Sequence, residues 1–109
     1  MFNASITIPL FLHAKLVADS FHLVQMALRS LNQTRVQLMK RFNPQSREYR
    51  VLKYYWRLYL KDYDGLEKRK SQWFVYIKNR MTQEQLVVAG LNLDQQFRQT
   101  YQAAQEAVT

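Results

Sequence analysis

The stretch FHLVQMALRSLNQTRVQLMKRF, residues 21–42, decides the fold. At 100° per residue its apolar positions fall within about 40° of one line, which is the pattern of an amphipathic helix. The sequence then predicts the end of this helix at Asn43-Pro44, because proline disfavours helical geometry in the residue before it. The apolar positions are Val24, Leu28, Leu31, Leu38 and Phe42.

Further helices are expected on the C-terminal side of this stretch. Ser46 is a suitable N-cap for a second helix that runs to about Asp62. A turn at 63–65 separates it from a third helix, expected over residues 66–78, with three side chains packed inward: Trp73, Phe74 and Ile77.

Two more helices are expected near the C-terminus. Thr82 and Gln85 resemble a capping box that begins the first of them, and Gly90 ends it. Asn92 with Gln95 repeats the capping pattern. The last helix then places five apolar side chains on one face: Leu93, Phe97, Tyr101, Ala104 and Val108.

A strand is expected only near the N-terminus. Residues 15–18, Lys-Leu-Val-Ala, predict a short buried strand that ends at Asp19, and Ser20 is placed to cap the helix that follows. With only two glycines and two prolines, the chain favours helices over a turn-rich β fold. We therefore expect a mainly α fold of about four to five helices, with at most one or two short N-terminal strands.

Length and composition exclude several classes of protein. The 109 residues allow one domain, and the absence of cysteine excludes disulfides and thiolate metal sites. The apolar run at 6–12 is too short to span a membrane and is interrupted by Pro9. We expect a cytoplasmic protein without membrane contact.

The positive charge is concentrated in one block. The net charge of the chain is +8, whereas residues 29–80 hold 14 bases and 4 acids, a net of +10. Residues 81–109 hold one base and three acids, a net of −2. Such a block indicates a polyanionic partner, of which nucleic acid is the commonest. The alternative is a surface that serves only solubility.

A stripe of DNA-binding candidates lies on the second expected helix. Its members fall within about 80° of one another, largely opposite the apolar side, and no acid stands among them. Bases with an interleaved aromatic ring can bind phosphates and stack on bases or sugars. The alternative is an ordinary solvated face. The members are Arg47, Arg50, Tyr54, Arg57 and Lys61.

Arg35 is placed unusually, in the middle of the apolar stripe of residues 21–42 and about 20° from Val24. A guanidinium group there must extend to solvent, pair with an acid or face a ligand such as DNA. Both a structural ion pair and a direct DNA contact stay open.

Asp19 is the candidate for metal chemistry. A carboxylate at the end of a strand and before a helix can join others in holding divalent metals for phosphoryl transfer. The alternative is a helix cap, which is the usual role of an Asp beside Ser at a helix start. Elsewhere His22 reads as structural, and no His or acid cluster has metal-ligand spacing.

Three runs of sequence resemble the DDE transposases of the ISL3 insertion-sequence family. Residues 14–39, AKLVADSFHLVQMALRSLNQTRVQLM, are similar to the family's strand, second catalytic Asp, Phe-His pair and helix with Leu-Asn-x-Thr-Arg. Residues 52–66, LKYYWRLYLKDYDGL, resemble its Tyr-Trp-x-Leu-Leu-Leu-Lys stretch. Residues 81–102 fit a helical segment further on. The resemblance covers about residues 11–108.

The resemblance implies an RNase H-like enzyme in which three acids hold two divalent metals, usually Mg²⁺. It assigns Asp19 as the second acid and places the other two outside the chain, before Met1 and after Thr109. It also implies that residues 1–19 belong to the catalytic core and residues 20–109 to a helical insertion region that binds transposon-end DNA. Such a fragment is not expected to be catalytic alone. Ser20 departs from the family, which often has Arg there.

Two alternatives from other classes stay open. One is a stand-alone basic helical protein that binds DNA or regulates, although no helix-turn-helix pattern is recognisable. The other is a protein-interaction module, in which a homo-oligomer covers the apolar surface of an incomplete core.

Overall fold

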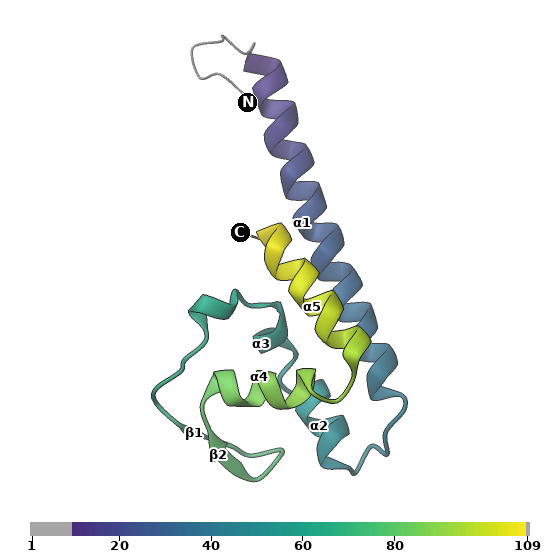
Figure 1. Ribbon diagram of the computed structural model, residues 1–109, viewed down its shortest axis with the longest axis vertical. Helices are drawn as coiled ribbons and strands as arrows, with labels where there is room; N and C mark the ends of the chain where they lie inside the picture. The colour runs from purple at the N-terminus through teal and green to yellow at the C-terminus, as the bar shows by residue number, and fades with distance from the viewer. Residues whose placement is uncertain (1–9, 109) are drawn as a thin grey trace.

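The computed structural model describes the backbone of residues 10–108 and the side chains of residues 20–107. The mainly helical fold expected from the sequence is confirmed. Figure 1 shows that α5 runs beside the C-terminal half of α1, while the other elements gather at one end. In chain order the elements are α1 (Leu10–Met39), α2 (Arg47–Lys53), α3 (Trp56–Leu60), the 3-10 turn η1 (Tyr63–Gly65), β1 (Gln72–Phe74), β2 (Asn79–Met81), α4 (Gln83–Leu91) and α5 (Gln95–Val108).

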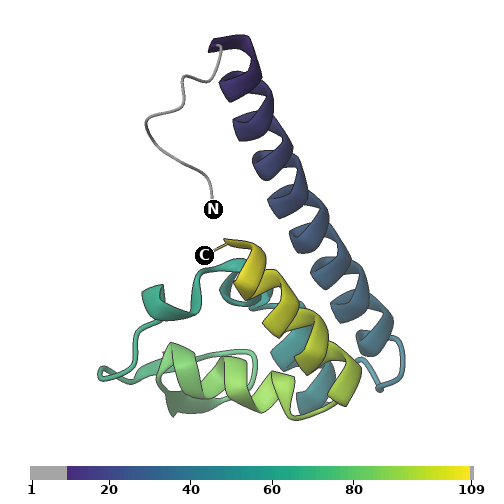
Figure 2. The same cartoon turned by 45° about the horizontal axis from the view of Figure 1, so that its top comes forward.

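The apolar sides of α1 and α5 meet along one side of the core, and the segments between the two helices supply its other buried residues. Both helices carry large side chains at spacings of three or four residues, so each presents a continuous apolar stripe to its neighbour. Figures 1 and 2 both show α1 projecting well beyond the end of α5. The stripe of α1 is therefore buried only in its C-terminal part. The buried residues of the two helices are Leu31 and Leu38 on α1, and Phe97, Tyr101 and Ala104 on α5.

The strand expected at 15–18 is wrong, because these residues lie inside α1. The helix also runs through Ser20, which is therefore not a cap. A strand must pair its backbone N–H and C=O groups with a neighbour, and the two strands of the described chain, β1 and β2, pair with each other. A helix satisfies these groups within itself. The two short strands are at 72–74 and 79–81, far from the N-terminal region.

The second expected helix, from Ser46 to about Asp62, is broken into α2 and α3. Its start is confirmed, since Ser46 Oγ accepts the backbone N–H of Tyr49 at 3.2 Å. The break leaves the carbonyl groups of Val51 and Leu52 without their usual partners four residues ahead. Other donors take these places. The Tyr59 hydroxyl donates to the Val51 oxygen at 3.0 Å, and Arg35 donates to that of Leu52 at 2.7 Å.

The third expected helix, over 66–78, is wrong, and a β-hairpin stands in its place. β1 and β2 pair antiparallel, with Trp73 opposite Arg80, and Lys78 takes a left-handed φ of 48° in the connecting turn. The run Trp-Phe-Val-Tyr-Ile at 73–77 is rich in aromatic and β-branched residues, which fit strands better than helices. Phe74 and Ile77 pack inward as expected, but Trp73 does not.

The start of α4 follows the sequence closely. The Thr82 hydroxyl accepts the N–H of Gln85 at 3.1 Å, and the Gln85 side chain accepts the N–H of Thr82 at 2.9 Å, so the capping box is confirmed. α5 is capped differently from expectation. Asp94 rather than Asn92 accepts the N–H of Phe97, at 3.1 Å. The Phe97 bond holds the pKa of the Asp94 carboxyl below its usual range.

Tyr59 joins these elements at the centre of the core. Its side chain is fully buried, and its ring lies 5.4 Å from that of Phe97 between centroids. Its hydroxyl and ring press against Gly90 of α4, where a side chain would not fit. Burial raises the pKa of Tyr59 well above its ordinary value, so the hydroxyl stays protonated and keeps donating to Val51.

Replacing Gly90 by Ala is expected to destabilise the fold, although Ala is normally favoured over Gly inside a helix by about 1 kcal/mol. The new Cβ would overlap Tyr59. Overpacking of this kind costs about 1–3 kcal/mol, and urea titration should show that loss in the unfolding free energy. Gly65→Ala is the control, because its Cβ would meet only the flexible Lys61 side chain. Equal effects of the two substitutions would contradict the close approach.

Replacing Arg35 by Ala is expected to lower the thermal midpoint. The change removes the donor from the buried Leu52 carbonyl, and an unpaired buried acceptor costs about 1–3 kcal/mol. In a domain of this size, each kcal/mol lost from the unfolding free energy lowers the thermal midpoint by roughly 4–8 °C. Arg29→Ala, at an exposed position of the same helix, should change the midpoint little. An unchanged midpoint in Arg35→Ala would show that the bond to Leu52 does not stabilise the fold.

Candidate nucleic-acid interface

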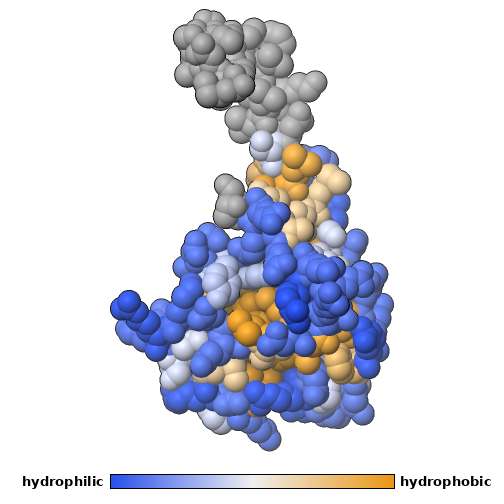
Figure 3. Space-filling model, viewed as in Figure 1, coloured by the Kyte–Doolittle hydropathy of each residue, from blue (hydrophilic) through white to orange (hydrophobic). Residues whose placement is uncertain are grey.

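The basic block at 29–80 covers the C-terminal third of α1 and the chain from there into β2. Figure 3 shows hydrophilic side chains over most of one face of this region, with apolar ones at its centre and along the projecting part of α1. Arg41 forms an ion pair with Asp94 of α5, 3.1 Å between Nη1 and Oδ1. Arg47 and Arg50 instead donate to neutral oxygens, those of Ile77 and Gln45. These hydrogen bonds therefore leave the positive charges of the two arginines unneutralised.

The expected basic stripe is divided between two helices. Arg47 and Arg50 lie on α2, Tyr54 follows its end, Arg57 lies on α3 and Lys61 comes directly after α3. Because the helix is broken at Tyr54 and Tyr55, the five side chains do not follow one line along one helix. Arg47, Arg57 and Lys61 are exposed, Arg50 is half-buried, and the Tyr54 side chain is 42% exposed.

The guanidinium of Arg35 lies inside the protein, with the residue only 7% exposed. It donates to the Leu52 carbonyl, to the side-chain oxygen of Asn32 at 2.9 and 3.1 Å, and to the sulfur of Met39. These partners are neutral, so the group does not form the structural ion pair that we considered with any of the described side chains. Burial lowers the pKa of Arg35. A contact with DNA would require the guanidinium to leave Leu52, and that role stays a prediction.

Asp19 lies within α1, and its side chain falls outside the described part of the chain. Its roles as catalytic acid and metal ligand stay predictions. Among the described residues, no group of three or more His, Cys, Asp and Glu side chains could hold a metal ion. His22 is exposed on α1.

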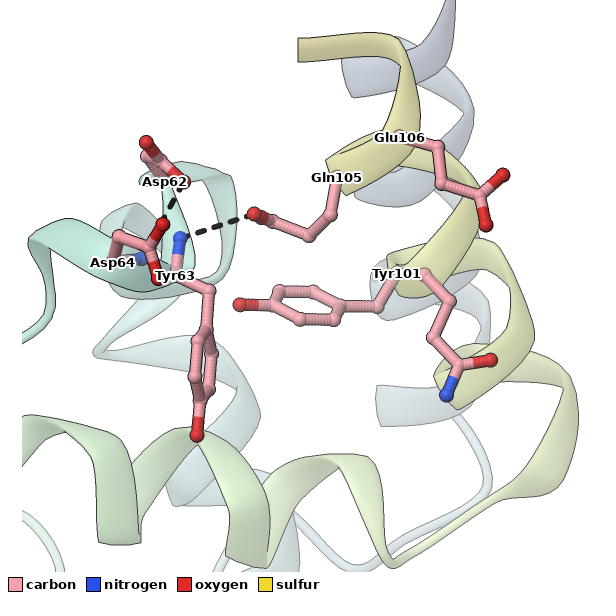
Figure 4. Close-up of a pocket in the computed structure, with 7 residues that line it drawn as sticks. Asp62, Tyr63, Asp64, Tyr101, Gln105 and Glu106 are labelled. Carbon is pink, nitrogen blue, oxygen red and sulfur yellow. Dashed lines mark hydrogen bonds between the residues drawn. The ribbon is translucent and has the colours of Figure 1, made fainter. Parts of the chain in front are cut away.

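Acids do gather around one cavity, of about 390 Å³, between η1 and α5 (Figure 4). Asp62, directly before η1, and Asp64 within it line one side of the cavity, Glu106 of α5 lines the other, and the ring of Tyr101 lies between them. The Tyr101 hydroxyl is buried without a hydrogen-bond partner among the described residues, and burial raises its pKa to about 12. The carboxylates of this cavity are separated by the Tyr101 ring, and they do not form a group that could hold a metal ion.

A second groove, of about 300 Å³, lies between the α2–α3 junction and the hairpin, and we call it the aromatic groove. It was missed by the sequence analysis, which placed Trp73 in the core. Trp73 is 53% exposed and Trp56 is 39% exposed. The dense runs of aromatic residues at 54–56 and 73–76 were the available clue. The groove is lined by Tyr54, Tyr55, Trp56, Arg57, Leu58, Gln72, Trp73, Phe74, Val75 and Gln83.

The walls of the aromatic groove are held together by contacts between the two elements. The rings of Tyr54 and Tyr76 are stacked, 4.0 Å apart between centroids and 14° between planes. The Tyr55 hydroxyl accepts the backbone N–H of Tyr76 at 3.0 Å, and its ring meets Phe74 edge-on at 5.0 Å. The junction and the hairpin therefore form one surface.

Comparison with known proteins gives one match. A family model described as a transposase, of the ISL3 type, matches residues 4–109. No curated protein and no solved structure matches the chain. In the described part of the chain, no helix combines the length and the apolar character needed to cross a membrane. The family match spans nearly all of the sequence, and the chain belongs to the ISL3 family of transposases.

Proposed function

We propose that this chain is the helical DNA-binding part of a transposase, and that its basic surface holds transposon-end DNA during cleavage and strand transfer. The observation that carries the proposal is the concentration of charge in a member of a transposase family. Residues 29–80 hold 14 bases against 4 acids. Phosphate neutralisation by Lys and Arg supplies most of the affinity of such surfaces for DNA.

The exposed bases of α2 and α3 are the contacts we propose. Arg57 and Lys61 are exposed, and the exposed Arg47 is steadied by its bond to the Ile77 carbonyl. Contacts of this kind position a protein on the phosphate backbone without reading the base sequence. We therefore propose binding that is sensitive to salt and largely indifferent to sequence. Arg35 is left out of this surface because its guanidinium is buried.

We further propose, from the family resemblance, that Asp19 is one of three metal-binding acids of a DDE-type active site on an RNase H-like core. The acids of the described residues do not form a metal set among themselves. A pair of Mg²⁺ ions would therefore need two more carboxylates beside Asp19. When bound, such metals activate water or a 3′-OH for attack on a phosphodiester.

The proposal divides the chain at residue 19. Residues 1–19 would belong to the catalytic core and residues 20–109 to the helical region, in an enzyme that works in the cytoplasm. α1 runs unbroken from Leu10 to Met39, across that boundary. A continuous helix would fix the orientation of the basic surface relative to the core.

One observation favours a second candidate function, assembly into a homo-oligomer. Phe21 and Leu23 are each 62% exposed and Met26 is 51% exposed, all on α1. At 100° per residue, Leu23 and Met26 share one side of the helix and Phe21 lies on the other. Exposed apolar side chains that lie together mark interaction surfaces. Under the first proposal the catalytic core covers them. Association of the isolated chain that disappears in a Phe21→Ser, Leu23→Ser variant would favour the second.

Replacing Arg47, Arg50, Arg57 and Lys61 together by Ser is expected to weaken DNA binding and its salt dependence. Loss of four phosphate contacts should flatten the slope of log K against log salt by roughly 3 to 4 for duplex DNA. Fluorescence anisotropy at several salt concentrations measures the slope. The control replaces four other exposed bases and so removes the same charge: Arg29, Lys40, Arg69 and Lys70. An equal loss in both variants would contradict a localised surface.

The isolated chain is expected to show no metal-dependent DNA cleavage or strand transfer. One matching carboxylate, Asp19, cannot hold two metal ions. Supercoiled plasmid incubated with pure protein and Mg²⁺ or Mn²⁺ tests this. If the chain nicks the plasmid and Asp19→Ala abolishes the nicking, the other two metal-binding acids cannot lie in other parts of the enzyme, and the proposal is contradicted.

A further inference from the structure

We propose that the aromatic groove binds an unpaired base of single-stranded DNA by stacking, with Trp73 as the main platform. This inference rests on the proposed DNA-binding function and adds to it a preference for strands whose bases are free. The first observation is the exposure of the two tryptophan side chains. Tryptophan side chains are usually largely buried, yet both tryptophans of this chain line the groove and are partly exposed, 39% at Trp56 and 53% at Trp73.

The rims of the groove extend this aromatic surface. Val75 is 59% exposed and Tyr76 is 48% exposed, both in the hairpin turn beside Trp73. A run of exposed large side chains on a small basic protein marks a place where a partner binds. The groove has room for a flat ring, since its volume is about 300 Å³.

The hairpin that carries Trp73 is anchored to the rest of the protein by contacts of its neighbouring residues. Phe74 is 3% exposed and anchors the hairpin in the core. Tyr55 reaches from the α2–α3 junction and holds the hairpin through the N–H of Tyr76 and the ring of Phe74. Ordered walls lose little conformational entropy on binding, so stacking on them contributes more to affinity.

Cations surround the groove. The Arg57 guanidinium lies 5.1 Å from the centre of the Trp56 ring, and the Lys53 ammonium lies 5.4 Å from that of Tyr54. Arg80 is exposed and stands directly opposite Trp73 in the hairpin, so the two side chains share a face. No Asp or Glu is among the lining residues.

Exposed aromatic rings together with cations favour single-stranded DNA as the ligand of the groove. A single strand alternates flat bases with phosphates, and proteins bind it with aromatic platforms set among cations. A duplex keeps its bases stacked inside and offers the groove only phosphates. A second copy of this basic chain would bring like charges against Arg57 and Arg80, which disfavours it as the occupant.

The test uses the 109-residue chain and three DNA probes of similar length: an oligothymidine of about 12 nucleotides, within the size range of single-strand sites, the same strand with abasic residues, and a duplex. Tryptophan fluorescence, excited at a wavelength where the tyrosines do not absorb, reports on the groove because both tryptophans line it. We expect quenching by oligothymidine and little by the abasic strand. Oligothymidine should also bind more tightly than the abasic strand.

Trp73→Ala should weaken oligothymidine binding roughly 5- to 150-fold, the range for one stacked base, and leave duplex and abasic binding nearly unchanged. Trp73→Phe should recover part of the loss. Val88→Ala is the control and should change nothing, because Val88 is 40% exposed on α4 and does not line the groove. Circular dichroism melts confirm that the variants fold.

Equal affinity for oligothymidine and the abasic strand, or an unchanged preference in Trp73→Ala, would overturn the inference while duplex binding still supports the proposed function. Failure to bind any probe at low salt would overturn both. Protein association that Trp73→Ala abolishes would show that a second copy occupies the groove, and would overturn the inference as well.

Discussion

The hydrogen bond from Arg35 to the Leu52 carbonyl, 2.7 Å long, holds the rest of the structure in its arrangement. It is buried, and it occurs where the chain between α2 and α3 leaves helical geometry. The Tyr59 hydroxyl does the same for Val51 one residue earlier. Two buried donors thus stabilise a broken helix whose carbonyls would otherwise be unsatisfied.

The break determines what the surface offers. It divides the basic stripe between α2 and α3, and it allows Tyr54, Tyr55 and Trp56 to meet the hairpin. A straight helix would have carried the bases along one line and turned these rings away from one another. The same feature therefore separates the phosphate-binding candidates and builds the aromatic groove beside them. Transposases act on DNA, and a surface that combines charge with open rings suits that partner.

The sequence predicted what depends on local patterns and missed what depends on distant contacts. The Ser46 cap and the Thr82 capping box need only neighbouring residues, and both are confirmed. The helix predicted over 21–42 is confirmed in part, since α1 begins earlier, at Leu10, and ends at Met39, which leaves Phe42 outside it. The break after α2 depends on Arg35 and Tyr59 from other parts of the chain. The apolar run at 15–18 suited either a strand or a helix, and pairing decides between them.

Hydrogen–deuterium exchange with and without a DNA ligand measures whether DNA lies across the α2–α3 junction and the hairpin. We expect slower exchange of backbone amides at 54–58 and 72–80 when an oligothymidine is bound, with little change along α5. Protection confined to α5 or to the projecting part of α1, with none at the junction or the hairpin, would contradict this placement of the DNA.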